Sequence, residues 1–385
     1  MSGDSAPWSA ATPRRWVAIC ARGLEEILER EARAAGLAVE TAEAGGVAFR
    51  GTLADGLRAN WRLRTANRVL LELASWPAPD DEALYRGARE LLAGELAGLL
   101  GPERTFSVAA TSGRSRVRDT RWVALKVKDG LVDGQRARFG ERASVDRIDP
   151  DLALRVRLFE DRATLLADSS GEPLDRRGYR LETTAAPVRE QLAAAAVLAS
   201  GWDGLGPVVD PMCGSGTLLA EAGAIALGLA PNRLRARWAF ERLPGFERAA
   251  FERLRAEPFP APGPAVRLCG RDLDAQAVAA ARRNLEAAGL GDRARIDLGD
   301  AFAFEPPPGP GLVAVNPPYG ERLGAEGDAA WRRLGDLLKQ RYRGWKAIVL
   351  AGGEGLGKHL GLKPVRRIPV RNGPLEARIL VLDLW

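Results

Sequence analysis

From residue 207 onward, short apolar runs alternate with longer amphipathic segments, and this pattern constrains the fold more than any other feature of the chain. Strands that alternate with helices favour a parallel sheet, because each parallel connection must cross the sheet through a segment of helix length. Two further apolar runs, 365–370 and 377–384, are separated by a short loop and predict an antiparallel hairpin. We therefore expect an α/β fold in which a doubly wound parallel sheet is closed by a hairpin. The runs predicted to form the parallel strands are 207–209, 266–269, 294–296, 312–315 and 347–350.

The first half of the chain predicts a separate α+β organisation in two small units, each with short strands and amphipathic helices. Asp119 is the expected N-cap of a long helix in the second unit, which reaches Phe139. Residues 171–186 hold Gly, Pro and charged residues without a sustained period, which is typical of a connection between domains. The expected boundaries are 1–13 for a flexible tail without the features of a secretion signal, 14–76 and 77–170 for the front units, 171–186 for a linker and 187–385 for the parallel-sheet domain.

The composition excludes several classes of protein. Apolar residues make up 46% of the chain and charged residues 28%, which is typical of a soluble globular protein. No apolar run approaches the ~20 residues of a membrane-spanning helix. The three cysteines are widely spaced and His359 is the single histidine, so neither a metal site nor a histidine-dependent catalytic triad is expected. We expect a cytoplasmic protein with no membrane and no metal requirement.

The octapeptide 210–217, Asp-Pro-Met-Cys-Gly-Ser-Gly-Thr, follows the first strand of the parallel sheet. Gly214 and Gly216 allow a tight turn and a close approach to a ligand, because neither has a Cβ atom. The following helix offers free N–H groups to a carboxylate, and Asp210 can attract an ammonium group. S-adenosylmethionine carries both groups, so this turn indicates a site for that cofactor. The alternative is a generic glycine-rich turn between a strand and a helix.

Two further acidic residues follow the next strands. Asp272 comes after the second strand, where a carboxylate can accept hydrogen bonds from both ribose hydroxyls, whereas Asp274 is the better candidate for the N-cap of the next helix. Asp300 follows the third strand, where a carboxylate can accept from an adenine amino group. The pattern Gly-x-Gly-x-x-Gly is absent, which argues against a nicotinamide enzyme. The expected cofactor-binding residues are Asp210, Met212, Gly214, Gly216, Thr217, Asp272, Asp300 and Ala301.

The tetrapeptide Asn316-Pro317-Pro318-Tyr319 ends the fourth strand. The Asn316 side chain and the Pro317 carbonyl can hold an amino group, and the two prolines fix the turn. Tyr319 offers a ring face on which a flipped base can stack. An exocyclic amine is a poor nucleophile, so most of the acceleration would come from aligning its nitrogen with the sulfonium methyl. Together with the cofactor turn, the tetrapeptide predicts methyl transfer to an exocyclic nitrogen of a nucleobase. The alternative is a proline-terminated strand beside a buried tyrosine.

Positive charge is concentrated in two stretches of the chain. The net charge is +6, and residues 331–371 hold 11 Lys and Arg against 2 Asp and Glu, whereas residues 101–150 hold 11 against 7. Clustering of this kind is typical of phosphate contacts with a nucleic acid, and a solvated helix surface is the alternative.

With these residues identified, the chain resembles the THUMP-containing class I RNA methyltransferases that modify guanine N2, and in particular the N-terminal half of the large-subunit rRNA guanine-N2 methyltransferases of the L type. The resemblance covers nearly all of residues 14–385. It implies a class I (Rossmann-like) methyltransferase domain at 187–385, a ferredoxin-like domain at 14–76 and a THUMP RNA-binding domain at 77–170. The segments that carry it are 125–129, 145–150, 174–180, 210–217 and 316–319.

The resemblance also implies roles for individual residues. Asn316, Pro317, Pro318 and Tyr319 would bind the target guanine and carry the catalysis, with S-adenosylmethionine as cofactor and RNA as partner. Some relatives carry a second methyltransferase domain, whereas this chain ends at Trp385 and is expected to make a single modification. We separately expect a monomer. The residues expected to contact RNA are Arg114, Arg116, Arg118, Lys126, Lys128, Arg177 and Arg180.

Several alternatives stay open at this point. The substrate is expected to be large-subunit rRNA on the strength of the front-half motifs, but relatives of the same architecture modify tRNA. A DNA adenine-N6 methyltransferase is a further alternative, since the tetrapeptide serves an adenine amine equally well. A non-catalytic RNA-binding protein is a third, although the intact Gly214, Gly216, Asp272 and Asn316 argue against it. Residues 231–264 could form a lid or a second RNA contact.

Overall fold

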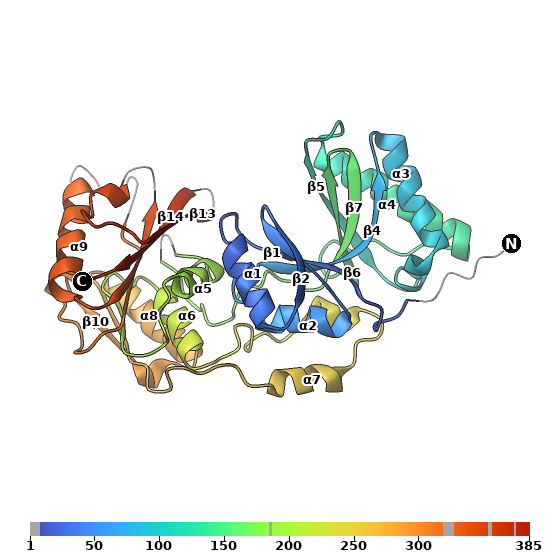
Figure 1. Ribbon diagram of the computed structural model, residues 1–385. Helices are drawn as coiled ribbons and strands as arrows, with labels where there is room; N and C mark the ends of the chain where they lie inside the picture. Colours follow the sequence, from blue (N-terminus) through green and yellow to red (C-terminus); the bar gives the residue numbers. More distant parts are fainter. Residues whose placement is uncertain (1–7, 185–186, 319–326, 353–355, 373–374) are drawn as a thin grey trace.

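The computed structural model describes residues 8–184, 187–318, 327–352, 356–372 and 375–385. These residues form two sheets of seven strands each, one in each half of the chain. Figure 1 shows the C-terminal sheet at the left and the N-terminal sheet at the centre and right, so that the two halves lie side by side along the long axis of the molecule. Among the helices of these ranges, none combines the length and the apolar character needed to cross a membrane.

The N-terminal sheet is continuous across the two front units. Its strand order is β2-β3-β1-β4-β7-β6-β5, and β4 joins the units because it pairs with both β1 and β7. The pair of β5 and β6 is parallel, and the other pairs of this sheet are antiparallel. The strands are β1 (Arg14–Ile19), β2 (Ala38–Glu43), β3 (Gly46–Gly51), β4 (Arg68–Pro77), β5 (Phe106–Gly113), β6 (Leu152–Phe159) and β7 (Arg162–Asp168).

Amphipathic helices pack against this sheet. Trp16 of β1 lies over Gly56, where a Cβ atom would be 2.3 Å from the indole ring, so only glycine fits at this crossing. The longest helix begins after Asp119, whose carboxylate accepts hydrogen bonds from the backbone N–H groups of Arg121 and Trp122; this confirms the predicted N-cap. The helices are α1 (Glu25–Ala34), α2 (Leu53–Arg62), α3 (Asp81–Glu90) and α4 (Thr120–Phe139).

The C-terminal sheet has the predicted doubly wound topology with a closing hairpin. Its order is β10-β9-β8-β11-β12-β14-β13, in which β10 to β12 are parallel and β14 runs antiparallel to both of its neighbours. The predicted turn of the hairpin falls partly on residues 373–374, outside the described residues. The strands are β8 (Val208–Asp210), β9 (Leu268–Asp272), β10 (Ala294–Leu298), β11 (Leu312–Val315), β12 (Lys346–Gly352), β13 (Arg366–Asn372) and β14 (Leu375–Asp383).

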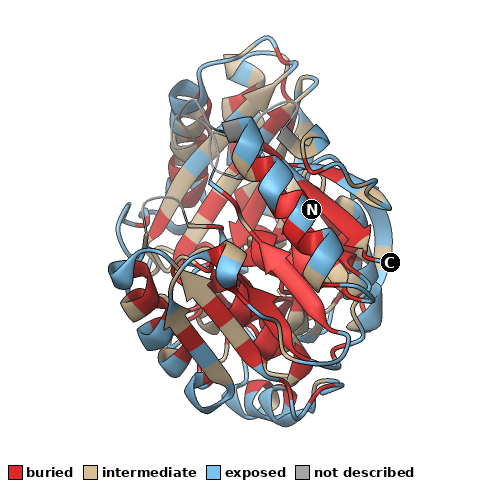
Figure 2. Ribbon diagram, turned by 90° about the vertical axis from the view of Figure 1, so that its left-hand side faces the viewer, coloured by how far each residue is buried: buried red, intermediate tan, exposed pale blue. Residues whose placement is uncertain are grey.

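Helices cover this sheet and enclose its core. All four residues of β11 are buried, as expected for a central parallel strand, and α5 is buried along almost its whole length because its alanines pack on every side. Figure 2 shows the same contrast, with the central strands largely buried and the outer helices alternating buried and exposed residues. These helices are α5 (Glu190–Ala199), α6 (Thr217–Ala226), α8 (Ala275–Ala287) and α9 (Gly327–Arg341), whereas α7 (Arg248–Ala256) contacts α2 of the front half.

Residues 231–264 leave the C-terminal domain and pack against the front half. In Figure 1 their helix α7 lies beneath α2, and the two helices are in contact. Trp238 packs edge-on against Trp61 of α2, with ring centroids 6.5 Å apart, and the Arg242 guanidinium donates to the Pro150 carbonyl over 2.6 Å. These residues therefore form a strap between the two halves. Most large apolar side chains of the strap, such as Trp238, Phe240 and Phe251, are buried, which argues against a lid, and the second RNA contact stays a prediction.

Candidate active site

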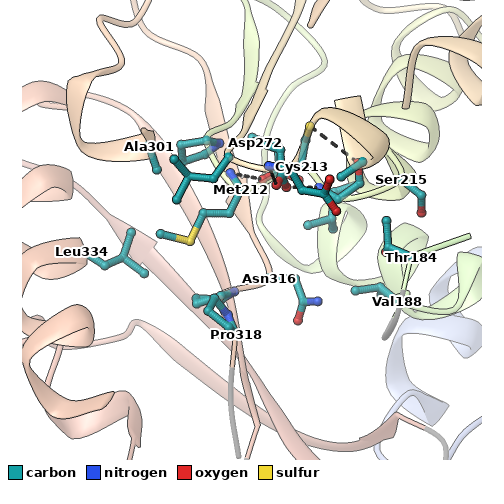
Figure 3. Close-up of a pocket in the computed structure, with 18 of the residues that line it drawn as sticks. Thr184, Val188, Met212, Cys213, Ser215, Asp272, Ala301, Asn316, Pro318 and Leu334 are labelled. Atoms are coloured by element: carbon teal, nitrogen blue, oxygen red, sulfur yellow. Dashed lines mark hydrogen bonds between the residues drawn. The ribbon is translucent and has the colours of Figure 1, made fainter. Parts of the chain in front are cut away.

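A cavity of about 540 Å³ opens at the carboxyl ends of β8, β9 and β11. The strand order reverses between β8 and β11, which is the place where open α/β sheets bind their ligands. Figure 3 shows Thr184, Val188 and Ser215 at one end of the cavity and Ala301 with Leu334 at the other, with Asp272 and Asn316 between them. The sequence-predicted residues that line it are Asp210, Met212, Gly214, Thr217, Asp272, Asp300, Ala301, Asn316, Pro317 and Pro318.

The glycine turn has the backbone conformation that its sequence predicts. Gly214 and Gly216 have φ angles of 52° and 82°, in the left-handed region that favours glycine. Gly216 is the N-cap residue of α6 and provides no side-chain cap, so the first N–H groups of that helix have no capping side chain. An anionic group placed here would meet free N–H donors and the positive end of the helix.

Asp272 is held in place by the turn that it faces. Its two carboxylate oxygens accept hydrogen bonds from the backbone N–H groups of Gly214, over 2.8 Å, and of Asp274, over 3.0 Å. Each oxygen keeps a further lone pair for a ligand hydroxyl. Asp274 caps α8 by accepting from the Gln276 N–H group, as predicted. Asp300 lines the far end of the cavity and accepts from the Phe302 N–H group.

Asp210 is a buried carboxylate on the floor of the cavity. It is 1% exposed, and the one hydrogen bond given to it by the described residues comes from the Met212 N–H group over 3.1 Å. Burial raises the pKa of Asp210 well above its usual range, and the negative charge of Asp272 raises it further. A cationic group bound in the cavity would offset this cost.

Asn316 stands at the end of β11 and lines the cavity. Among the described residues, no donor forms a hydrogen bond with its side-chain Oδ1 atom. Pro317 is buried and Pro318 is exposed. Tyr319, the last residue of the predicted tetrapeptide, lies outside the described residues. An unpartnered buried acceptor is costly in a folded protein and is a position at which an incoming N–H group can bind.

The structure adds lining residues that the sequence did not indicate. Leu273 lines the cavity and is 74% exposed. Its position directly after Asp272 is a signal in the sequence that could have indicated it as a lining residue. Trp331 and Leu334 come from α9, and no local pattern connects them with the cavity. Thr184, Pro187 and Val188 come from the end of the predicted linker and the residues that follow it. This segment is therefore a wall of the cavity.

The predicted RNA contacts in the front half do not line the cavity and lie on a loop and a helix beside the N-terminal sheet. Arg114, Arg116 and Arg118 are exposed on the loop after β5. Lys126 and Lys128 of α4 are only partly exposed, since Lys126 lies over the Trp122 ring and Lys128 pairs with Asp129. The structure brings the three arginines together on one loop and leaves the two lysines on a neighbouring helix.

Two predicted RNA contacts are corrected by the structure. Arg177 is 1% exposed and donates to the Leu174 and Arg64 carbonyls inside the molecule, so it cannot reach an RNA phosphate. The side chain of Arg180 is 17% exposed and donates to Glu190, Val188 and Thr217 behind the cavity wall. Both arginines occur in a charged stretch that resembles a surface loop, but their partners come from other parts of the chain.

Comparison with known proteins gives a consistent family. Residues 177–380 match the family described as the RMKL-like methyltransferase domain, residues 15–70 match the RlmL ferredoxin-like domain, and residues 78–168 match the THUMP domain. The Ribosomal RNA large subunit methyltransferase K/L of Stutzerimonas stutzeri (strain A1501) is 38% identical over 379 residues, which are 95% of this chain and 52% of the relative. This chain thus spans about half the length of the K/L relatives it matches.

Other relatives match over their full length. A candidate RNA methyltransferase of Synechocystis sp. (strain ATCC 27184 / PCC 6803 / Kazusa), slr0064, is 35% identical over 99% of this chain and 100% of its own. Among solved structures, the candidate methyltransferase SMU.472, complexed with SAH, has a TM-score of 0.86 at 28% identity and covers 97% of this chain and 98% of its own. A predicted N6-adenine-specific DNA methylase from Listeria monocytogenes str. 4b F2365 has a TM-score of 0.84 at 28% identity, over 97% of this chain and 96% of its own.

Proposed function

This chain belongs to the RMKL-like methyltransferase family, and on that premise we propose that it transfers a methyl group from S-adenosylmethionine to the exocyclic N2 of a guanine in RNA. The observation that carries the proposal is the meeting of the glycine turn, Asp272 and Asn316 in one cavity. A cofactor bound by the first two would lie beside the third. The proposed catalytic residues are Asn316, Pro317, Pro318 and Tyr319.

The residues of the cavity fit S-adenosylmethionine. The uncapped start of α6 suits its carboxylate, buried Asp210 gains from its ammonium group, and Asp272 suits the ribose hydroxyls. Ala301 lies at the end of the cavity that would hold the adenine (Figure 3), and its neighbour Asp300 also lines the cavity. The solved relative SMU.472 was crystallised with SAH, the demethylated form of this cofactor. When bound, the cofactor supplies an electrophilic methyl group on a sulfonium sulfur.

Asn316 would orient the amine that receives the methyl group. Its Oδ1 and the Pro317 carbonyl would accept the two N–H groups and turn the nitrogen lone pair toward the methyl carbon. A bound S-adenosylmethionine would supply the methyl group to this nitrogen and would retain the electron pair of the broken carbon–sulfur bond as the neutral thioether SAH. The methylated nitrogen then loses a proton to solvent.

RNA is the proposed substrate because the front half matches a THUMP domain, and large-subunit rRNA is favoured because the K/L relatives carry that name. Arg114, Arg116 and Arg118 are proposed as phosphate contacts, together with Lys126 and Lys128. tRNA guanine N2 is the nearest alternative substrate. An adenine amine of DNA is a second candidate, since the Listeria structure bears that name and the Asn316 acceptors would hold an adenine N6 in the same way.

The catalytic proposal predicts that Asn316→Ala lowers kcat about 100-fold, because the amine loses its orienting acceptor. The affinity for SAH should stay within about twofold, since Asn316 is not placed on the cofactor turn. Asn316→Asp keeps an acceptor oxygen and should retain most of the activity that the alanine variant loses. Equal losses in both variants, or a parallel loss of SAH affinity, would show that Asn316 supports the fold of the site instead.

The substrate is tested by incubating the protein with labelled S-adenosylmethionine and equal amounts of unmodified rRNA, tRNA and double-stranded DNA. Nucleoside mass spectrometry then identifies the product. Label in N2-methylguanosine from rRNA supports the proposal. The same nucleoside from tRNA alone would correct the substrate, and N6-methyladenine from DNA would overturn the choice of base. The absence of any labelled product with a protein that binds SAH would contradict the catalytic role.

A further inference from the structure

The cavity wall formed by Thr184 and Val188 is fastened from behind by Arg180. The Nε atom of Arg180 donates to the Glu190 carboxylate over 2.9 Å, and its Nη2 atom donates to the Val188 carbonyl over 2.6 Å and to Thr217 Oγ1 over 3.1 Å. Arg180 does not line the cavity itself. One guanidinium therefore joins the wall to the first residue of α6.

We propose that Arg180 is a positioning residue for the carboxylate end of the cofactor, an inference that rests on the proposed function. Thr217 directly follows Gly216, the N-cap residue whose helix end has no capping side chain. This helix end is the part of the cavity suited to a carboxylate. By holding Thr217 and Val188 together, Arg180 fixes the space between the wall and the free N–H groups.

A second residue, Asn284, holds the segment that leads into this wall. Asn284 of α8 is 1% exposed, accepts from the Leu181 N–H group over 2.8 Å, and donates to the Glu182 carbonyl over 2.9 Å and to the Ser215 carbonyl over 3.0 Å. It ties the wall to the glycine turn as Arg180 ties it to α6. In Figure 3, Thr184, Val188 and Ser215 lie together at this end of the cavity, away from Ala301. The reinforcement is thus concentrated at the end proposed for the carboxylate.

Charge gives Arg180 a second effect on an anionic ligand. The Glu190 side chain is 9% exposed and lies on the Nε side of the guanidinium, whereas Thr217 lies on the Nη2 side. Glu190 therefore stands close behind the helix end, and Arg180 neutralises it. Without Arg180 this buried carboxylate would repel a ligand carboxylate across a poorly hydrated wall.

The test compares two ligands that differ in the methionine half. SAH carries the carboxylate and the ammonium group, whereas 5′-methylthioadenosine has the same adenosine and thioether and lacks both. Calorimetry should show that Arg180→Gln weakens SAH binding at least tenfold, which corresponds to about 1.4 kcal/mol, and changes the affinity for 5′-methylthioadenosine by less than twofold. Arg180→Gln with Glu190→Gln should recover only part of the SAH affinity, because it removes the repelling charge but does not restore the contacts to Val188 and Thr217. Arg283→Gln is the matched control, since Arg283 pairs with Glu182 on the exposed side of the same wall.

Each outcome decides the matter. An equal loss for both ligands would mean that Arg180 only supports the fold of the wall, and an unchanged SAH affinity would also overturn the inference. If Arg180→Gln does not fold, Arg180→Lys keeps the charge but loses the fork of donors, and a selective loss of SAH affinity in that variant supports the proposal. A wild-type protein that binds neither ligand would refute the proposed function itself. If the wild type binds both ligands and the Arg180 variants do not behave as expected, only the inference about Arg180 fails.

Discussion

Arg177 offers a test of how the two halves of the chain are joined, because its charge is buried between them. Its Nη1 atom donates to the Leu174 carbonyl over 2.6 Å, and its Nη2 atom donates to the Arg64 carbonyl of the front half. Its Nε atom lies 3.7 Å from the Glu221 carboxylate of α6. Glu221 is 2% exposed and also accepts from the Tyr179 hydroxyl over 2.9 Å. Replacing Arg177 by Met removes the positive charge and leaves Glu221 buried.

The size of the effect follows from burial. Removing one partner of a buried ion pair typically costs 3–5 kcal/mol, since the remaining charge stays out of water. Arg64 and Arg233 also act on Glu221 electrostatically, so they compensate part of the loss. We therefore expect Arg177→Met to lower the free energy of unfolding by about 3 kcal/mol, which corresponds to a fall of roughly 4 °C in the melting temperature when 385 residues unfold together at about 2.1 cal/mol/K per residue.

Urea unfolding followed by tryptophan fluorescence and by circular dichroism measures this change. Arg176→Met is the matched control, because the Arg176 side chain is 70% exposed and should change stability by less than about 0.5 kcal/mol. Adding Glu221→Gln to Arg177→Met should restore at least about 1 kcal/mol, since it removes the unpaired charge. A loss below about 1 kcal/mol in the single variant, with weaker RNA binding, would refute the buried role and return Arg177 to the RNA-facing surface.

Two further predictions concern Asp210 in the cavity and the three arginines on the loop after β5. Because burial raises the pKa of Asp210, its ionised form costs stability at neutral pH; Asp210→Asn should raise the melting temperature at pH 7 while weakening SAH binding. That gain should vanish as the pH falls below about 4, where the carboxyl is protonated in both the folded and the unfolded state, and a gain that persists there would refute the explanation. Replacing Arg114, Arg116 and Arg118 by Gln should reduce the log–log salt slope of RNA binding by up to about three, one unit for each lost phosphate contact. The same change at Lys126 and Lys128 should reduce it less, since these lysines are partly covered, and the reverse order would move the RNA to α4.

Most of the fold is predictable from local patterns, and the exceptions have a common cause. The parallel strands, the closing hairpin and the Asp119 cap follow from periodicity and capping chemistry. Strand β2 cannot be predicted from such patterns, because all but one of its residues are exposed and its sequence has no apolar alternation. It lies at the edge of the sheet and pairs with β3 across a bulge between Val39 and Thr41. An edge strand that buries almost nothing leaves no hydrophobic signal in the sequence.

The candidate site likewise contains residues that the sequence predicts and residues that it does not. Asp272, Asp300 and Asn316 follow successive strands, and parallel strands bring their carboxyl ends to one edge, so sequence order alone brings them together. The wall at Thr184 and Val188 has no such guide. Its place depends on Arg180 meeting Thr217 and on Asn284 meeting Ser215, which are contacts between distant segments. From the sequence, Arg177 and Arg180 resemble exposed residues, because the burial of an ion pair depends on a partner that the local sequence does not contain.

The linker and the strap together explain why the cavity and the front half act as one body. Arg64 of the front half donates to the Leu229 carbonyl, just before the strap, and Arg62 pairs with Glu257 of the strap over 2.9 Å. Gly23 approaches β13 so closely that a Cβ atom would lie 1.8 Å from the Pro369 carbonyl oxygen. A hinge motion would have to expose the buried charges of Arg64 and Arg177 and separate this backbone contact, which is unfavourable on both counts. Under the proposed function, bringing a target base into the cavity costs unstacking energy, and contacts between the protein and the RNA would have to offset this cost without a rearrangement between the two halves.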